Sequence, residues 1–266
     1  MKILVCIKQV PDTTDIKWTE NNTIQREGVE SIINPFDVYA IEEAIRLKDY
    51  LLANSICENV EITALTMGPQ QATGMLKKAI AVGCDNGVLI SDKKFAGADT
   101  YATGKTLASA IKTNFSDFDL IICGQFAIDG DTAQTGPSVA SQLGIPQVTY
   151  AKKLDRCDGS SIYAQRELEE GIETVKVNFP ALICVLKGDY EPTRPRINGI
   201  KKAQNFEIRV LSMEDIGLTA EEVGIKGSPT YVSKAFRPEH NRAKCVFLNS
   251  LEELKDKIIE FGGDNE

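Results

Sequence analysis

Short apolar runs alternate along this chain with longer segments of helical periodicity, and no other feature limits the fold as strongly. The runs are nearly continuous in apolar, β-branched residues, as buried parallel strands are, and they lie at 2–8, 60–66, 87–90 and 119–124. The intervening segments repeat apolar residues at helical spacing and lie at 36–53, 69–83 and 99–114. Strands and helices that alternate in this way predict an α/β fold, a doubly wound and mostly parallel Rossmann-like sheet with helices on both faces.

The chain changes character after residue 146. Residues 147–187 have the pattern of hairpin strands with a turn at Asp158-Gly159, and a proline-containing loop follows Lys187. The remaining tail has too little apolar sequence to fold alone, so we expect it to wrap around its own domain or a partner. We therefore divide the chain into an α/β nucleotide-binding domain, 1–205, and a C-terminal arm with a terminal helix, 206–266.

Charge and hydropathy exclude two broad classes. The 266 residues carry a formal net charge of -8, whereas non-specific nucleic-acid binding needs a basic surface. No apolar run approaches the ~20 residues of a membrane span. The apolar stretch Ile3–Ile7 is too short for a signal peptide. We expect a cytoplasmic protein that binds no nucleic acid.

The cysteine and histidine content argues against catalytic side chains and metal ligands. The seven cysteines include no C-x-x-C pair, and Cys6, Cys123 and Cys184 lie in apolar runs where cysteine acts as a small hydrophobe. The one histidine, His240, lies in a polar stretch and has no second histidine to assist it. We expect no metal site and no catalytic residue, so any chemistry must come from a bound group.

The stretch from Gly124 to Pro146 has more hydrogen-bonding capacity than a simple connection needs. Four segments should meet at the carboxyl edge of the sheet, where α/β proteins bind ligands: 9–15, 34–37, 66–69 and this stretch. Residues 132–135 are expected to form a first helical turn whose free N–H groups attract phosphate. The hydroxyls of Thr132, Thr135 and Ser138 would add donors. Gly130 and Gly136 would let a ligand approach the backbone.

Two carboxylates weaken this interpretation. Asp129 and Asp131 would repel phosphate, although either could instead cap the helix or bind a ribose hydroxyl. An ordinary helix-capping loop explains the stretch equally well. The stretch is neither a G-x-G-x-x-G nor a Walker-type motif, so the pattern alone predicts a nucleotide-binding α/β domain and no more.

Several ordered motifs resemble the β subunit of electron-transfer flavoproteins along nearly the whole chain. They are "VCIKQVPD", "INPFDVYAIEEAIRLK", "TMGP" followed by "LKKAIAVGCD", "GQFAIDGDTAQTGP" and "AQRELEEGIETVKVNFPALICV". The family usually has Asp-Gly-Gly where this chain has Glu169-Glu170-Gly171. The resemblance implies a heterodimer with an α subunit, which carries a mobile electron-transferring FAD and is held by the arm at 206–266.

The resemblance also implies which residues surround an adenine nucleotide. They are Cys6, Asn34, Phe36, Asp37, Met67, Gly124, Gln125, Asp129, Gly130, Asp131, Thr132, Ala133, Gln134, Thr135, Gly136 and Ser138. The nucleotide is AMP in the housekeeping branch of the family. In the bifurcating branch it is a second FAD, which takes hydride from NADH and divides the electrons between two acceptors.

The motif "AIDGDTAQTGP" is similar to the bifurcating branch, because its small Gly130 and Ala133 and its Pro137 differ from housekeeping members. The implied partners are ferredoxin or flavodoxin as the low-potential acceptor, and a flavin dehydrogenase of the acyl-CoA or D-2-hydroxy-acid type. A housekeeping carrier with AMP, or a stand-alone nucleotide-binding domain, are the alternatives.

Partner contacts are expected at two places. By its position in the family's recognition loop, Ile197 would anchor the dehydrogenase, unless it folds back on its own domain. Arg166 and Glu167 are candidates for docking the mobile flavin domain, and a simple surface pair explains them equally well.

Overall fold

The computed structural model describes residues 1–12, 31–233 and 247–262. Two expectations made from the sequence fall outside this range. They concern His240 and the end of the segment 9–15.

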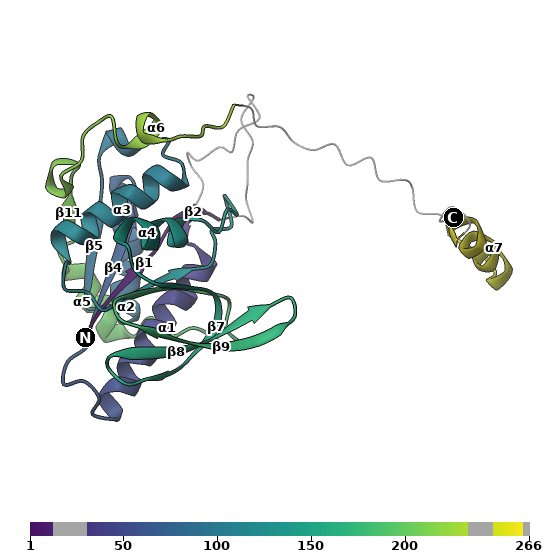
Figure 1. Cartoon of the computed structure of the whole chain (residues 1–266), viewed down its shortest axis with the longest axis horizontal. Helices are drawn as coiled ribbons and strands as arrows, with labels where there is room; N and C mark the ends of the chain where they lie inside the picture. The colour runs from purple at the N-terminus through teal and green to yellow at the C-terminus, as the bar shows by residue number, and fades with distance from the viewer. Residues whose placement is uncertain (13–30, 234–246, 263–266) are drawn as a thin grey trace.

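One nine-stranded sheet forms the centre of the molecule (Figure 1). Its order is β11-β5-β4-β1-β6-β10-β7-β8-β9, and the pairs from β11 through β7 are parallel. The parallel strands are β1 Lys2–Cys6, β4 Glu61–Met67, β5 Asn86–Ile90, β6 Leu120–Gly124, β7 Gln147–Cys157, β10 Ala181–Val185 and β11 Arg209–Leu211, and the other two are β8 Ser161–Leu168 and β9 Gly171–Asn178. A second, antiparallel pair joins β2 Gln9–Pro11 to β3 Ser31–Ile33.

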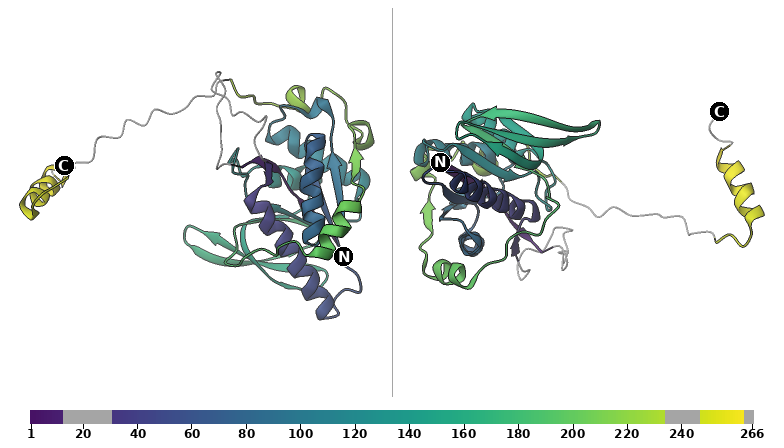
Figure 2. Two further views of the ribbon diagram at one scale, coloured as in Figure 1. Left: turned by 180° about the vertical axis from the view of Figure 1, so that it is seen from behind. Right: turned by 90° about the horizontal axis from the view of Figure 1, so that it is seen from below.

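Helices cover both faces of this sheet, which confirms the predicted α/β fold with its large, mostly parallel sheet. On one face lie α1 Pro35–Ala53, α2 Thr73–Val82 and α5 Ile197–Asn205; on the other lie α3 Thr100–Asn114 and α4 Thr135–Leu143 (Figures 1 and 2). The two apolar cores follow strand alternation, since Ile3 and Val5 point to the α1 side and Leu4 to the α3 side.

The hairpin expected after residue 146 forms the far edge of the sheet. The long strand β7 turns at 158–160 into β8 Ser161–Leu168, which pairs with β9 Gly171–Asn178, and both pairs are antiparallel. Oδ1 of Asp158 accepts the N–H groups of Ser160 at 2.9 Å and Ser161 at 2.7 Å, and Gly159 takes a φ of 87°. These hydrogen bonds confirm the predicted turn.

The segment after Lys187 contains a helix that the sequence analysis missed. Helix α5 begins at Ile197, where only a loop was expected. The backbone of Gly199 packs so closely on the carbonyl of Ala81 in α2 that a side chain there would collide with it. The hydrophobic pattern of α5 was hidden because Ala203 is its only buried residue.

The first part of the arm packs on this chain itself. Strand β11 extends the sheet beside β5, and Leu211, Met213, Ile216 and Val223 are buried on the α3 side. Short helical turns at 93–95 and 214–216 and the four-residue α6, Gly224–Gly227, complete this region, and a further turn at 70–72 precedes α2.

Helix α7, Leu251–Gly262, lies apart from the main body (Figures 1 and 2). Its apolar residues Leu251 and Ile258 are exposed. The boundary at 205/206 and the docking of the arm on a second subunit stay predictions. Within the described ranges, no helix is both long and apolar enough to cross a membrane.

The packing of β11 generates a stability prediction. Leu211 is 2% exposed, whereas its neighbour Val210 is 42% exposed. We expect Leu211→Ala to lower the free energy of unfolding by about 2–4 kcal/mol through a core cavity, and Val210→Ala to cost less than about 1 kcal/mol. Urea unfolding of the purified chain measures both. Equal effects of the two changes would mean that β11 does not belong to the core.

Candidate functional site

The chain changes direction across the sheet between β1 and β6, the two strands at its centre. From β1 it leads through α1 to β4 on one side, whereas β6 lies on the other side. Such a switch point leaves a crevice outside the carboxyl ends of the strands, where open α/β sheets bind ligands. The first turn of α1 and the loop 125–134, which follows β6, meet there.

Asn34 fixes the loop after β6 to the start of α1. Its side-chain Nδ2 donates to the carbonyl of Phe126 at 2.9 Å, and its Oδ1 accepts the N–H of Ile128 at 3.2 Å. The rings of Phe36 and Phe126 pack with centroids 4.2 Å apart. Because Asn34 is buried and both ends of its amide are hydrogen-bonded, the loop is held in one position.

Asp37, in the first turn of α1, joins the ends of β1 and β6. Its Oδ2 accepts the N–H of Lys8 at 2.6 Å and its Oδ1 accepts the N–H of Gly124 at 3.1 Å. A side chain at Gly124 would collide with this carboxylate, so only glycine fits. Burial raises the pKa of Asp37 to about 7, and the hydrogen bonds that it accepts oppose this rise only in part.

The loop carries one paired carboxylate and two strained residues. Lys8 Nζ lies 2.5 Å from Oδ1 of Asp129, so one of the two acidic groups that would repel phosphate is neutralised. Asp131 and Ala133 have positive φ values of 49° and 53°, a conformation that is uncommon outside glycine and that ends helical geometry.

The expected helical turn at 132–135 is therefore wrong. Helix α4 begins at Thr135, because the backbone at Asp131 and Ala133 cannot continue a right-handed helix. Within the described residues, the N–H groups of Thr132, Ala133 and Gln134 make no hydrogen bond.

The helix start adds further free donors. The first turn of α4 supplies the N–H groups of Thr135 and Gly136, which a helix leaves without an internal acceptor, whereas Pro137 has none. This row of backbone donors suits the oxygens of a phosphate group.

The two loop glycines do different things. A Cβ on Gly130 would meet no described residue within 4 Å, so this position has room for a ligand beside the described part of the fold. A Cβ on Gly136 would collide with the sulfur of Cys184, so the missing side chain allows α4 to pack on the sheet, and the approach of a ligand to the Gly136 backbone stays a prediction. The side chain of Ser138 on α4 lies against Gly104 of α3 and is therefore between the two helices.

Cysteines lie in a row beneath the loop. Cys6, Cys123 and Cys184 occupy matching positions on the adjacent strands β1, β6 and β10. Burial raises the pKa of Cys184 to about 12, and the contact with Cys6 together with burial raises that of Cys123. The thiols of Cys123 and Cys184 are therefore neutral at pH 7 and form an uncharged floor. Met67 ends the neighbouring β4 and packs partly into the core.

Gln125 faces away from this loop. It is 3% exposed, and its Oε1 accepts the N–H of Tyr150 on β7 at 2.5 Å. Tyr150 itself has a positive φ of 57° at a register irregularity in the β7–β10 pairing. Gln125 therefore positions β7 relative to the loop.

The sequence analysis missed Lys8 and Phe126 as parts of the site. Lys8 lies two residues after β1, and a basic residue just after a strand that leads to the switch point is a signal that could have identified it. Phe126 has no comparable signal, because its role depends on contact with Asn34 and Phe36 across the fold.

The expected partner residues lie outside this loop. Arg166 on β8 lies 3.2 Å from Glu173 and 3.3 Å from Thr149, and Glu167 lies 3.6 Å from Lys152. These interactions leave the proposed docking role of Arg166 and Glu167 a prediction. Ile197 is 73% exposed at the start of α5.

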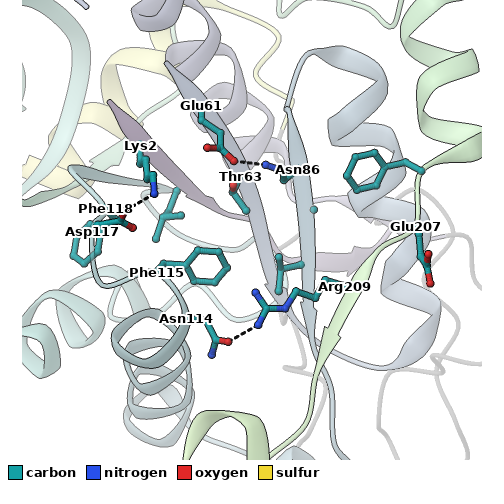
Figure 3. Close-up of a pocket in the computed structure, with 14 residues that line it drawn as sticks. Lys2, Glu61, Thr63, Asn86, Asn114, Phe115, Asp117, Phe118, Glu207 and Arg209 are labelled. Carbon is teal, nitrogen blue, oxygen red and sulfur yellow. Dashed lines mark hydrogen bonds and ion pairs between the residues drawn. The ribbon is translucent and has the colours of Figure 1, made fainter. Parts of the chain in front are cut away.

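A separate pocket of about 350 Å³ opens at the opposite, amino-terminal edge of the sheet (Figure 3). Most of its polar side chains pair with one another: Lys2 with Asp117, Asn86 with Glu61, and Arg209 with Asn114. Since these groups satisfy each other, the pocket does not compete with the carboxyl edge as the candidate site.

The raised pKa of Asp37 predicts a pH effect on stability. The pKa of an aspartate in the unfolded chain is about 3.9, so the folded state binds the Asp37 proton more tightly than the unfolded state does. Protonation of Asp37 therefore stabilises the fold. This stabilisation is complete below about pH 4 and is lost as the pH rises to about 7. Relative to Asp37→Asn, wild-type ligand-free chain should lose up to about 1.4 kcal/mol per pH unit in that window. Urea unfolding at several pH values measures this difference. Parallel pH profiles would contradict the protonation of Asp37.

Comparison with known proteins gives a consistent result. The electron transfer flavoprotein domain matches residues 21–216. The chain is 45% identical over 269 residues to the electron transfer flavoprotein subunit beta of Megasphaera elsdenii, covering 98% of this chain and 97% of that one. It is 39% identical over 271 residues to the acryloyl-CoA reductase electron transfer subunit gamma of Anaerotignum propionicum, covering 98% of each. It is 42% identical over 241 residues to the caffeyl-CoA reductase-Etf complex subunit CarD of Acetobacterium woodii, covering 90% and 88%. The chain therefore belongs to the electron transfer flavoprotein family, as a β subunit.

Proposed function

We propose that this electron transfer flavoprotein β subunit binds FAD at the carboxyl edge between β1 and β6 and works in electron bifurcation. The observation that carries this proposal is the row of backbone N–H groups at Thr132–Gly136, which find no acceptor among the residues that the structure describes and lie beside the neutralised Asp129. A diphosphate needs several donors close together, and this loop offers them without a basic cluster.

The chain's own residues bind and orient the cofactor. Asn34 and Asp37 hold the loop against α1, and the free N–H groups would contact the phosphates. The thiols of Cys123 and Cys184 beneath them carry no charge at pH 7. When bound, the flavin supplies the redox chemistry, taking hydride from NADH and passing electrons on. Neither a metal cluster nor a nucleophile–base pair is needed for this role.

FAD is favoured over AMP by the small residues of the loop. Gly130 is open on its side-chain face, and Ala133 and Pro137 are compact, which leaves room beside the phosphates. A structural AMP in a non-bifurcating carrier is the second candidate, because the same donors suit its single phosphate.

The names of two relatives support the choice of partners. One is an electron transfer subunit of acryloyl-CoA reductase, and another belongs to a caffeyl-CoA reductase-Etf complex. We propose for this chain an α subunit, a flavin dehydrogenase of the acyl-CoA or D-2-hydroxy-acid type, and ferredoxin or flavodoxin as the low-potential acceptor. The exposed Ile197 would anchor the dehydrogenase, and the exposed Arg194 and Arg196 beside it would steer an acidic surface.

Cofactor content tests the site directly. The heterodimer, purified with its α subunit, should release two FAD and no AMP on denaturation, as measured by chromatography. Gly130→Asp should lower the FAD content to about one per heterodimer, because a second unpaired carboxylate weakens phosphate binding by about tenfold or more. Gly130→Asn, with the same shape and no charge, should retain two. One FAD and one AMP in the wild type would instead make the chain an ordinary electron carrier.

The docking role of Ile197 gives a second test. The partner in this test is an acyl-CoA dehydrogenase that exchanges electrons with the wild-type complex. Ile197→Ala should weaken its binding by about tenfold or more, since the change removes a side chain that would be buried in the interface. The heterodimer and its cofactor content should not change. Ile172→Ala, at an isoleucine of β9 that is 62% exposed, serves as the matched control. Equal affinities for wild type and Ile197→Ala would contradict this role.

A further inference from the structure

The segment 189–196, here called the docking loop, leads from the sheet to Ile197 and is held from one side by α1. Its exposed residues include Arg194 and Arg196, and it contains Pro192 and Pro195. A loop with so little buried apolar surface needs polar contacts to keep one position. Three charged residues of α1 supply most of those contacts, and Lys152 of β7 adds an ion pair at 3.8 Å to Asp189.

Glu43 and Arg46 hold Tyr190 at the start of the docking loop. The Tyr190 hydroxyl donates a hydrogen bond to Oε1 of Glu43. The guanidinium of Arg46 lies 3.5 Å from the centroid of the Tyr190 ring, and the Tyr39 ring packs at 5.6 Å. The tyrosine is therefore fixed by its ring and by its hydroxyl.

Glu42 holds the docking loop three residues later. Its Oε2 accepts the backbone N–H of Thr193 at 2.8 Å, while its Oε1 accepts Nε of Arg46 at 2.9 Å. Burial opposes ionisation of Glu42, but the Thr193 and Arg46 hydrogen bonds outweigh it and lower its pKa. Glu42 is 4% exposed, so this charge is buried against the docking loop.

The pKa of Glu43 is shifted in the opposite direction from that of Glu42. It is 6% exposed, and burial raises its pKa despite the hydrogen bond from Tyr190. Removing the hydroxyl of Tyr190 would leave this buried carboxyl without that partner, which is costly. The two adjacent carboxyls thus both depend on the docking loop, and the docking loop depends on them.

The other side of Ile197 is also anchored. Helix α5 packs on α2 through Gly199 and the buried Ala203, and Lys202 Nζ lies 3.3 Å from the carbonyl of Cys84. Ile197 is the first residue of this helix and is left exposed between two anchors. A side chain held in this way loses little freedom when it enters a partner's pocket.

We propose that Tyr190 is a positioning residue, which with Glu42, Glu43 and Arg46 holds the docking loop so that Ile197 faces a partner dehydrogenase. This set of four residues, here called the α1 anchor, acts on binding only through the geometry of the docking loop. The partner role rests on the proposed function, whereas the effect on the docking loop does not. Because α1 also carries Asp37, the docking loop and the nucleotide site are built on one helix.

The first experiment measures trypsin cleavage of the Arg196–Ile197 bond in the full-length chain purified with its α subunit. Cleavage requires the docking loop to open locally, so its rate reports the population of open states. Tyr190→Phe should raise this rate about tenfold, because the ring stays and the hydrogen bond to Glu43 is lost. The melting temperature and the cleavage rates elsewhere should stay at wild-type values.

Matched variants separate positioning from general destabilisation. Tyr50→Phe changes a half-exposed tyrosine of the same helix and should leave the rate unchanged. Glu43→Ala should open the docking loop as Tyr190→Phe does, whereas Glu43→Gln, which keeps an acceptor oxygen, should restore most of the protection. A wild-type cleavage rate in Tyr190→Phe, or equal rates for Glu43→Ala and Glu43→Gln, would overturn the α1 anchor.

A double-mutant cycle then tests the link to the partner. Tyr190→Phe should weaken dehydrogenase binding by about fivefold in the wild-type background and much less in Ile197→Ala, since both act through the same contact. Equal effects in both backgrounds would overturn action through Ile197. If the cleavage rate rises but Ile197→Ala binds normally, the anchor stands and the docking role of Ile197 fails.

Discussion

The carboxylate of Asp37 joins the three elements on which the candidate site depends. It accepts backbone N–H groups from the end of β1 and the end of β6 while lying in the first turn of α1. Gly124 leaves the space that this contact needs. A buried carboxyl is costly, and its raised pKa reflects that cost, but the hydrogen bonds set the distance between the two central strands and the helix. The loop after β6 can then be held by Asn34 at the same corner.

Backbone strain at two residues of that loop determines where α4 begins and which N–H groups stay outside the helix. A helix that began at residue 132 would have used its own carbonyls as acceptors from the second turn onward and would have directed only its end toward a ligand. Positive φ values at Asp131 and Ala133 instead delay the helix to Thr135 and leave consecutive N–H groups without an acceptor in the described part of the chain. The pairing of Lys8 with Asp129 removes one negative charge from the same place. Together these features are the basis of the anion site that we propose for a chain with a net charge of -8.

Helix α1 contacts two regions that lie far apart in sequence and for which we propose different functions. Its first turn supports the proposed nucleotide site, and its next turns, through Glu42, Glu43 and Arg46, support the docking loop. Because α1 is one continuous helix, its first turn and the turn that carries Glu42, Glu43 and Arg46 have fixed positions relative to each other. The proposed cofactor site and the proposed partner surface of this electron transfer flavoprotein β subunit would therefore keep a fixed relation.

The sequence by itself determined the fold class and the carboxyl-edge loop, because strand and helix periodicities and glycine-rich turns are local properties. It also pointed to Asn34 and Asp37 through resemblance. Tertiary structure alone decided that α4 starts at Thr135, that Gly136 serves packing on Cys184, and that β11 joins the sheet. Those outcomes depend on which atoms lie within a few ångströms of each other across the fold, and no local pattern encodes such distances.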